Sequence, residues 1–378
     1  MALGIILAAS LLLSLVLPSG GQIIQPSPLV TGAASAARIW YMQGNGLWVM
    51  NFDGSGRAQV AANLKKSPSG CATFSVSPNG RRVAYQSSDG QLVVANAQGG
   101  DVRSVATGRV GSVSWSPDSQ QIVYSLNDDI YVYKVDGGGK PETLATGGGR
   151  FYFPTFAPDG RNLAFLEAPG GTLFNVIVLR ATDQEWRNLG TTGASSQGVD
   201  SLCPTVVKWS PEGTRLLIDY GEPVFVFYLA GGTPTQVGGR GETASHLWDP
   251  SSSMLAFKEA DNSLWLVNAD GSGQRPLVAE PVGEAVWHPT GRPLITYTAF
   301  GQDRLNDLWI INVENGQKQQ LTAGDTSIEL GLNWTPDGNS VIFERRGAQG
   351  ESQGVWKVST NGNDLVQLAP AGSAIQVR

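Results

Sequence analysis

The sequence is poor in the residue types on which most catalytic and metal sites are built. Its 378 residues include two histidines and two cysteines. Its repeats leave no stretch of about two hundred α/β residues for a hydrolase domain, and it has no glycine-rich phosphate loop that leads from a strand into a helix. These absences argue against a serine hydrolase, a nucleotide-binding enzyme and a histidine-rich metal enzyme. We therefore expect no catalytic residues, no metal site and no cofactor.

Charged residues are also scarce, and acidic residues outnumber basic ones. The 26 Lys and Arg residues are outnumbered by 32 Asp and Glu residues, which gives a net charge of −6. A protein that binds nucleic acid needs a basic face to meet the phosphate backbone. We expect no nucleic-acid partner.

Long apolar runs are missing except at the N-terminus. Residues 3–17 read LGIILAASLLLSLVL, which is too short to span a bilayer comfortably and resembles the apolar core of a secretory signal. No Lys or Arg precedes the run. We interpret residues 1–21 as a signal peptide or an N-terminal anchor and residues 22–37 as a leader. The expected location is periplasmic or extracellular, with the membrane involved only through that anchor.

Glycine and proline, by contrast, are abundant, and both mark a repeated turn. The stretch SVSWSPDSQQIVYSL at 112–126 has alternating apolar residues on both sides of Ser116-Pro117-Asp118. Proline presets φ for the second position of a turn, and Asp or Gly suits the positions that follow. The stretch therefore predicts a β-hairpin.

This hairpin pattern occurs seven times. A large apolar residue lies two positions before each proline, and an aliphatic residue lies five positions after it, as at Ile122, Leu294 and Val341. Spacings of 39 to 53 residues are typical of one four-stranded propeller blade per repeat. The prolines are Pro78, Pro117, Pro158, Pro211, Pro250, Pro289 and Pro336.

The chain begins one strand out of phase with this repeat. Residues 38–60 align with 254–277 as second, third and fourth strands, and the C-terminal residues 374–377 align with an innermost strand. We therefore predict that residues 38–378 form one all-β domain, a β-propeller of eight four-stranded antiparallel blades closed by overlap of the N- and C-terminal strands. Seven blades remain the alternative, if residues 345–378 do not complete a sheet.

In a propeller of this kind the two histidines lie apart from each other, and so do the two cysteines. His246 and His288 fall in consecutive blades at opposite ends of the inner strand, so we do not expect them to share a metal ion. Cys71 and Cys203 lie three blades apart, too far for a disulfide bond.

The repeats resemble the WD40-like repeats of TolB-type β-propellers. The resemblance rests on Trp-Ser-Pro-Asp-Gly patterns followed by an aliphatic and aromatic strand, best seen at 115–124, 156–165 and 334–343, and on the Asp-Ile-Tyr-Val-like segment at 128–133. It implies a periplasmic scaffold that binds partner proteins in the cell envelope. TolB also has an α/β domain before its propeller, for which the residues before Arg38 leave no room, so we expect a TolB-like protein without that domain.

A binding surface is expected on one face of the ring. The proline turns are short and share a face, whereas the opposite face collects the longer loops, and long loops on a rigid scaffold commonly carry binding residues. The candidate binding residues on that face and at the channel mouth are Arg150, Tyr152, Lys208, Arg240, Glu242, Arg304 and Arg345.

The function predicted from these features is non-catalytic binding of a protein, peptide or glycan partner by an exported, monomeric propeller. Two alternatives remain open. One is an envelope enzyme, either a propeller lyase or the accessory propeller of a hydrolase. The other is the ligand-sensing ectodomain of an anchored protein.

Overall fold

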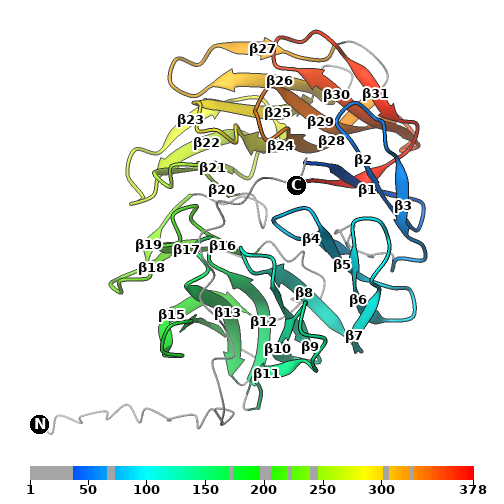
Figure 1. The fold of residues 1–378 in the computed structure, drawn as a ribbon. Coiled ribbons are helices and arrows are strands. Elements are labelled where there is room, and N and C mark those ends of the chain that lie inside the picture. Colours follow the sequence, from blue (N-terminus) through cyan, green and yellow to red (C-terminus); the bar gives the residue numbers. More distant parts are fainter. Residues whose placement is uncertain are drawn as a thin grey trace, which may run out of the picture.

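The chain folds into a ring of eight antiparallel sheets with four strands each (Figure 1). The structure is a computed structural model. The first strands of successive blades contact one another around the centre of the ring. The predicted eight-bladed propeller is confirmed, and the seven-bladed alternative is wrong. The structure describes residues 37–65, 73–147, 149–169, 173–195, 206–219, 224–238, 246–300, 306–323 and 327–378.

The predicted signal or anchor at 1–21, all but the last residue of the leader, Cys71 and Cys203 lie outside the described residues. Within the described part of the chain, no helix has the length and apolar character needed to cross a membrane.

The strands follow each other through the blades in chain order. Blade 1 contains β1 (Ile39–Gln43), β2 (Gly46–Met50), β3 (Ala58–Ala61) and β32 (Ser373–Val377); blade 2 contains β4 (Phe74–Val76), β5 (Arg82–Gln86), β6 (Gln91–Asn96) and β7 (Arg103–Thr107). Blade 3 contains β8 (Val110–Trp115), β9 (Gln121–Leu126), β10 (Asp129–Lys134) and β11 (Glu142–Ala145); blade 4 contains β12 (Gly149–Phe156), β13 (Asn162–Pro169), β14 (Leu173–Arg180) and β15 (Trp186–Ser195).

The second half of the ring repeats this order. Blade 5 contains β16 (Val207–Trp209), β17 (Arg215–Ile218), β18 (Phe225–Tyr228) and β19 (Thr235–Gln236); blade 6 contains β20 (Leu247–Trp248), β21 (Met254–Lys258), β22 (Leu264–Asn268) and β23 (Arg275–Val278). Blade 7 contains β24 (Val282–Trp287), β25 (Leu294–Phe300), β26 (Asn306–Asn312) and β27 (Lys318–Gln320); blade 8 contains β28 (Ser327–Trp334), β29 (Ser340–Gly347), β30 (Ser352–Ser359) and β31 (Val366–Ala369).

The proline turns form for the local reason that the sequence indicates. In the turn between β8 and β9, the Asp118 carboxylate accepts hydrogen bonds from the Ser116 hydroxyl (2.6 Å) and from the Gln120 backbone N–H (3.0 Å). Ser119 then adopts a positive φ of 64°, a conformation that glycine takes without strain at the corresponding position of other turns. The hairpin thus satisfies its own polar groups.

The seventh blade departs from the fixed spacing. Trp115 pairs with Ile122 and Trp334 with Val341, but Trp287 pairs with Ile295. The expectation that Leu294 occupies the buried position is therefore wrong by one residue. The turn at Gly291-Arg292-Pro293 contains one more residue than the others, and this shifts the register of β25.

Ring closure occurs as predicted from the phase of the repeats. The C-terminal strand β32 pairs antiparallel with β1 and becomes the innermost strand of blade 1. Arg38 and Arg378 exchange backbone hydrogen bonds of 2.6 and 3.2 Å at the end of this pair. Ile375 and Val377 are each 7% exposed, so the strand is anchored by both hydrogen bonds and apolar burial.

A tryptophan joins most neighbouring blades. In five junctions the indole N–H of the tryptophan before the proline turn donates to a backbone carbonyl of the preceding blade's first strand. The five bonds, of 2.9 to 3.5 Å, are Trp115 to Ser75, Trp209 to Thr155, Trp248 to Lys208, Trp287 to Leu247 and Trp334 to Val286. The tryptophan that the repeat places there therefore locks one blade to the next.

The three junctions without this tryptophan use a polar side chain from the preceding blade. Ser114 accepts from the Phe156 backbone N–H (3.3 Å), and Asn333 donates to the Ile375 carbonyl (3.1 Å). Gln376 makes two such bonds, accepting from the Val76 N–H (3.2 Å) and donating to the Phe74 carbonyl (3.0 Å). Every junction in the ring is thus bridged by a hydrogen bond.

Gln376 offers a direct test of these bridges. Gln376→Ala would remove both bonds between blades 1 and 2 and leave the partly buried Val76 N–H without an acceptor. We expect a loss of about 2 kcal/mol in the free energy of unfolding, measured by denaturant titration. The control is Gln367→Ala on the outer strand β31, where the side chain is exposed and bonds only the Gln353 carbonyl. Equal losses in both variants would contradict the prediction.

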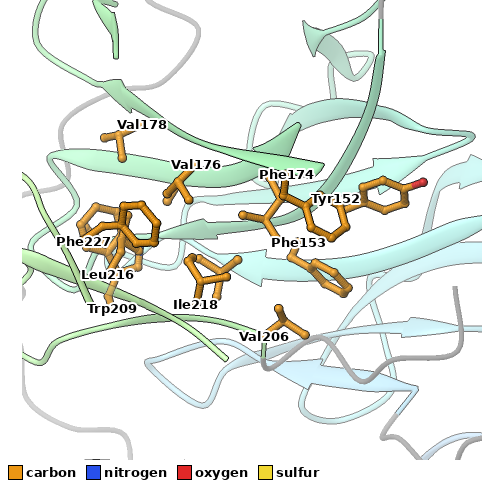
Figure 2. Packing of buried hydrophobic residues seen from close by; sticks show 14 of the residues in the cluster. Tyr152, Phe153, Phe174, Val176, Val178, Val206, Trp209, Leu216, Ile218 and Phe227 are labelled. Atoms are coloured by element: carbon orange, nitrogen blue, oxygen red, sulfur yellow. The ribbon is translucent and has the colours of Figure 1, made fainter. Parts of the chain in front are cut away.

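The hydrophobic core lies between the blades. Figure 2 shows one such layer, in which Tyr152, Phe153 and Phe174 of blade 4 face Ile218 and neighbouring residues of blade 5. Similar clusters fill other blade junctions. Each sheet thus buries its faces only against its neighbours, as expected for a closed repeat architecture.

Candidate functional site

The two faces of the ring differ in their connections. We call the face with the proline turns the proline-turn face, and we call the opposite face the loop face. The loop face contains a cavity of about 310 Å³ between blades 8 and 1. The cavity is lined by Met42, Gln43, Gly44, Glu344, Arg346, Gly350, Ser352, Ala371, Gly372 and Ser373. We refer to it as the closure pocket, because β1 and β32 contribute to its wall.

Strand alternation directs Glu344 and Arg346 into the closure pocket. Ile342, two residues earlier on β29, packs in a cluster with Ile39 and Ile375 of blade 1, and side chains at i, i+2 and i+4 share one face of a strand. A bulge interrupts the pairing of β29 with β30 between Glu344 and Arg346. Bulges bend a strand and redirect its side chains, so the bulge affects how Arg346 enters the pocket.

Glu344 holds the guanidinium of Arg346 in place. The Nε–H of Arg346 donates to Oε1 of Glu344 at 2.6 Å. The Glu344 side chain is 4% exposed, whereas that of Arg346 is 40% exposed. Burial raises the pKa of Glu344 above its usual range, although the hydrogen bond from Arg346 opposes the rise. The pair therefore has a buried anionic base and an accessible cationic end.

A third charged residue, Glu284 of β24, lies close to this pair. Its carboxylate accepts a hydrogen bond from the Leu332 backbone N–H at 3.1 Å, and its negative charge acts on both Glu344 and Arg346. Glu284 and Glu344 together outweigh the charge of Arg346. The surroundings of the pocket are therefore polar and not strongly cationic.

A second polar cluster joins blades 5 and 6 on the inner side of the ring. The Lys208 ammonium donates to Oδ2 of Asp219 (2.6 Å) and to the His246 carbonyl (2.7 Å). Nδ1 of His246 lies 3.0 Å from Oδ1 of Asp219. Burial alone would raise the pKa of Asp219, but the hydrogen bond from His246 and the charge of Lys208 lower it to about 2. This carboxylate therefore stays ionised deep in the protein.

Both histidines are buried against a glycine. His246 stacks on Phe257 at 5.2 Å, and a Cβ at Gly238 would lie 2.2 Å from its Nε2. His288 is tilted over Trp334 at 4.6 Å and bonds the Gly338 carbonyl at 3.0 Å. Among the described residues, no group of three or more His, Cys, Asp and Glu side chains is placed to hold a metal ion.

The structure places four of the seven predicted binding residues. Arg150 is exposed, with its Nε 3.7 Å from the Asp128 carboxylate. Tyr152 is 7% exposed and packs edge-on against Phe174. Lys208 belongs to the cluster with Asp219. These side chains lie in blades 4 and 5, whereas the closure pocket lies between blades 8 and 1.

Arg345 lies next to the closure pocket in sequence but points away from it. It is 6% exposed, bonds Glu329 at 2.8 Å, and lies over the Trp356 ring at 4.6 Å. Alternation on β29 explains this, because Arg345 faces blade 7 while Arg346 faces blade 1. Arg240, Glu242 and Arg304 lie outside the described residues. A binding role for these seven residues stays a prediction.

Sequence reasoning did not single out Glu344 and Asp219. The sequence does contain a feature that could have identified them. The second strand of each blade is mainly aliphatic, but in blade 8 it ends in Glu344-Arg345-Arg346, and in blade 5 it is followed by Asp219. Such residues follow apolar positions that are buried in every blade. An ionisable group there must find a partner or a ligand.

A second cavity of about 310 Å³ lies on the proline-turn face, also between blades 8 and 1. It is bordered by Ala37, Phe52, Lys357 and the turn at Thr335-Pro336-Asp337. Lys357 is used internally, because its ammonium donates to the Phe52 carbonyl at 2.9 Å. The first described residue, Ala37, thus lies at this face.

Comparison with known proteins agrees with this architecture. Residues 72–159 match the model of the dipeptidyl peptidase IV N-terminal region. No curated protein matches the chain. Among solved structures, the dihydro-heme d1 dehydrogenase NirN aligns with a TM-score of 0.62 and 13% identity over 93% of this chain and 79% of that chain.

Two further structures are similar. The C-terminal WD40 domain of Sif2 gives a TM-score of 0.60 with 12% identity, over 90% of this chain and 97% of that chain. A putative TolB from Agrobacterium tumefaciens has 14% identity over 72% of this chain and 87% of that chain, with a TM-score of 0.38. At these identities the alignments define the fold alone. The protein is an eight-bladed β-propeller.

Proposed function

We propose that the protein is an exported, non-catalytic propeller that binds a protein or peptide partner in the cell envelope through its loop face. The observation that carries this proposal is the closure pocket, where a half-exposed arginine is held by a buried glutamate. Rigid blades position such a pair at low entropic cost, which favours specific recognition. The export part of the proposal comes from the apolar run at 3–17.

The Asp219–His246 pair supports a structural role better than catalysis. The two side chains are 1% and 2% exposed, and the second oxygen of Asp219 is occupied by Lys208. A general base must come within hydrogen-bond reach of its substrate. Burial of this depth argues against that use and favours a cross-link between blades 5 and 6.

The proposal is tested by capture of partners from a native envelope extract with the full chain as bait. Charge reversal of Arg150, Arg240 and Arg304, three of the binding residues predicted from the sequence, is expected to lower the captured partner at least tenfold by quantitative mass spectrometry, because opposed surface charges impair docking. The matched control reverses three exposed arginines at proline turns, namely Arg81, Arg161 and Arg292. An unchanged capture profile in the variant of Arg150, Arg240 and Arg304, or an equal loss in the control, would exclude these three arginines from the binding surface.

A further inference from the structure

We infer, on the basis of the binding role proposed above, that the closure pocket binds a carboxylate group of a peptide, with Arg346 as the residue that holds it. Among the described residues of the loop face, this pocket brings a cavity and an accessible cation together. The partner class is thus a peptide with a free C-terminus or an acidic side chain that fits the pocket.

The free side of Arg346 is the first argument. Its Nε–H is bonded to Glu344, and its two terminal nitrogens make no further hydrogen bond with the described residues. A guanidinium presents its donors in a planar fork that matches the two oxygens of a carboxylate. Arg346 lines the cavity, and with Nε already fixed its two terminal nitrogens can donate two bonds to one ligand group.

The buried partner of Arg346 is the second argument. Glu344 is too enclosed to meet a ligand itself, but it fixes the rotamer of the arginine and keeps it charged. An arginine held in this way loses less side-chain entropy on binding than a free surface arginine. The role of Glu344 is therefore to position Arg346.

The rim supplies additional polar groups. The Oε1 of Gln43 accepts a bond from Arg57, which leaves its amide NH2 group for the pocket. Ser373, whose side chain is a hydroxyl, also lines the cavity. Both groups can donate hydrogen bonds to an acceptor, so the rim suits the oxygens of a carboxylate or of the adjoining peptide group.

The size of the pocket sets the size of the ligand group. A volume of about 310 Å³ is at the lower end of small-molecule sites, which range from about 300 to 1,000 Å³. This volume suits a terminal residue or one acidic side chain of a peptide. Glu284 and Glu344 also oppose a ligand with several negative charges, so a single carboxylate fits better than a polyanion.

The test is titration of the full chain with three defined probes, followed by heteronuclear NMR or calorimetry. The probes are N-acetyl-trialanine with a free C-terminal carboxylate, the same peptide as its C-terminal amide, and N-acetyl-Ala-Asp-Ala amide. We expect at least one carboxylate probe to bind ten times or more tightly than the trialanine amide. The free acid and the aspartyl peptide separate a C-terminal from a side-chain carboxylate. Equal binding of all three probes, or binding of none, would overturn the inference.

Substitutions at two positions, with opposite expected signs, identify the residue that binds the carboxylate. Arg346→Gln should weaken binding of the carboxylate probe at least tenfold, and Arg346→Lys should weaken it as well, because an ammonium lacks the planar fork. Glu344→Gln keeps an oxygen to accept the Nε–H but removes a negative charge, so it should tighten binding about threefold or more. Arg81→Gln, on the proline-turn face, is the control and should leave the affinity unchanged.

The opposite pattern would show that the pocket takes a cation. In that case Glu344→Gln would weaken binding and Arg346→Gln would not. The tighter binding expected of Glu344→Gln could not result from unfolding, because an unfolded variant would lose affinity. The result is independent of the envelope capture experiment. Carboxylate binding without capture of a partner would support the carboxylate site and contradict the proposed function. Capture of a partner without carboxylate binding would support the proposed function and contradict the carboxylate site.

Discussion

Deletion of residues 373–378 is expected to lower the melting temperature by about 10 °C. The deletion removes β32 together with its pairing to β1, and it exposes the apolar faces that Ile375 and Val377 cover. Ordering the strand costs conformational entropy, so the net loss is smaller than the sum of its contacts. We expect the free energy of unfolding to fall by about 5 kcal/mol, out of a total of roughly 5–15 kcal/mol for a folded protein. In a chain of this size each kcal/mol lost lowers the melting temperature by about 2 °C.

Calorimetry on the full and shortened chains measures this effect. A synthetic peptide of residues 371–378 should restore part of the lost stability when added in excess, because the edge of β1 that pairs with β32 remains available to it. A scrambled peptide of the same composition is the control. An unchanged melting temperature after deletion would mean that the terminal strand does not hold the ring closed.

Asp219→Asn is expected to cost about 3–5 kcal/mol in the free energy of unfolding. The substitution removes the carboxylate that the Lys208 ammonium bonds at 2.6 Å between blades 5 and 6, and removal of one member of a buried ion pair is strongly destabilising. Denaturant titration at pH 7 gives the measurement. The control is Asp101→Asn, whose half-exposed carboxylate pairs with Arg82 and Arg103 at the surface and should cost at most about 1 kcal/mol. Similar losses in the two variants would argue against a structural role for the buried cluster.

The same cluster predicts a pH dependence with a defined sign. Because the pKa of Asp219 is lowered to about 2 from an ordinary value of 3.8, the folded protein binds fewer protons there than the unfolded chain. The stability from this group is fully present above pH 4 and is lost as the pH falls towards 2. The stability difference between the wild type and Asp219→Asn should therefore shrink by about 2 kcal/mol over that range. A constant difference would contradict the lowered pKa.

The repeat made most of the architecture predictable. Each blade carries its own turn signal and its own apolar positions, and the phase shift at Arg38 left one strand to be supplied by residues 374–377. The structure agrees with this prediction because the turns and the apolar positions depend on nearby residues, and each blade repeats them at similar intervals. The register in blade 7 was not predictable from the same spacing, since one additional residue in the turn moved Ile295 into the place expected for Leu294.

The polar sites were less accessible to prediction, for a physical reason. Lys208 lies in β16, Asp219 directly follows β17, and His246 directly precedes β20 of the next blade. Their contact depends on how far each side chain reaches across the junction between the blades. Arg345 and Arg346 are adjacent in sequence, yet one is buried against Glu329 and the other lines the closure pocket. Only the direction of each side chain relative to the neighbouring blades distinguishes them.

The closure pocket has walls from two segments that lie far apart in the sequence. Met42 to Gly44 come from β1 and the turn after it, and Ala371 to Ser373 come from the start of β32 and the residues just before it. The cavity therefore exists only after β32 has paired with β1, which makes its shape a report on whether the ring has closed.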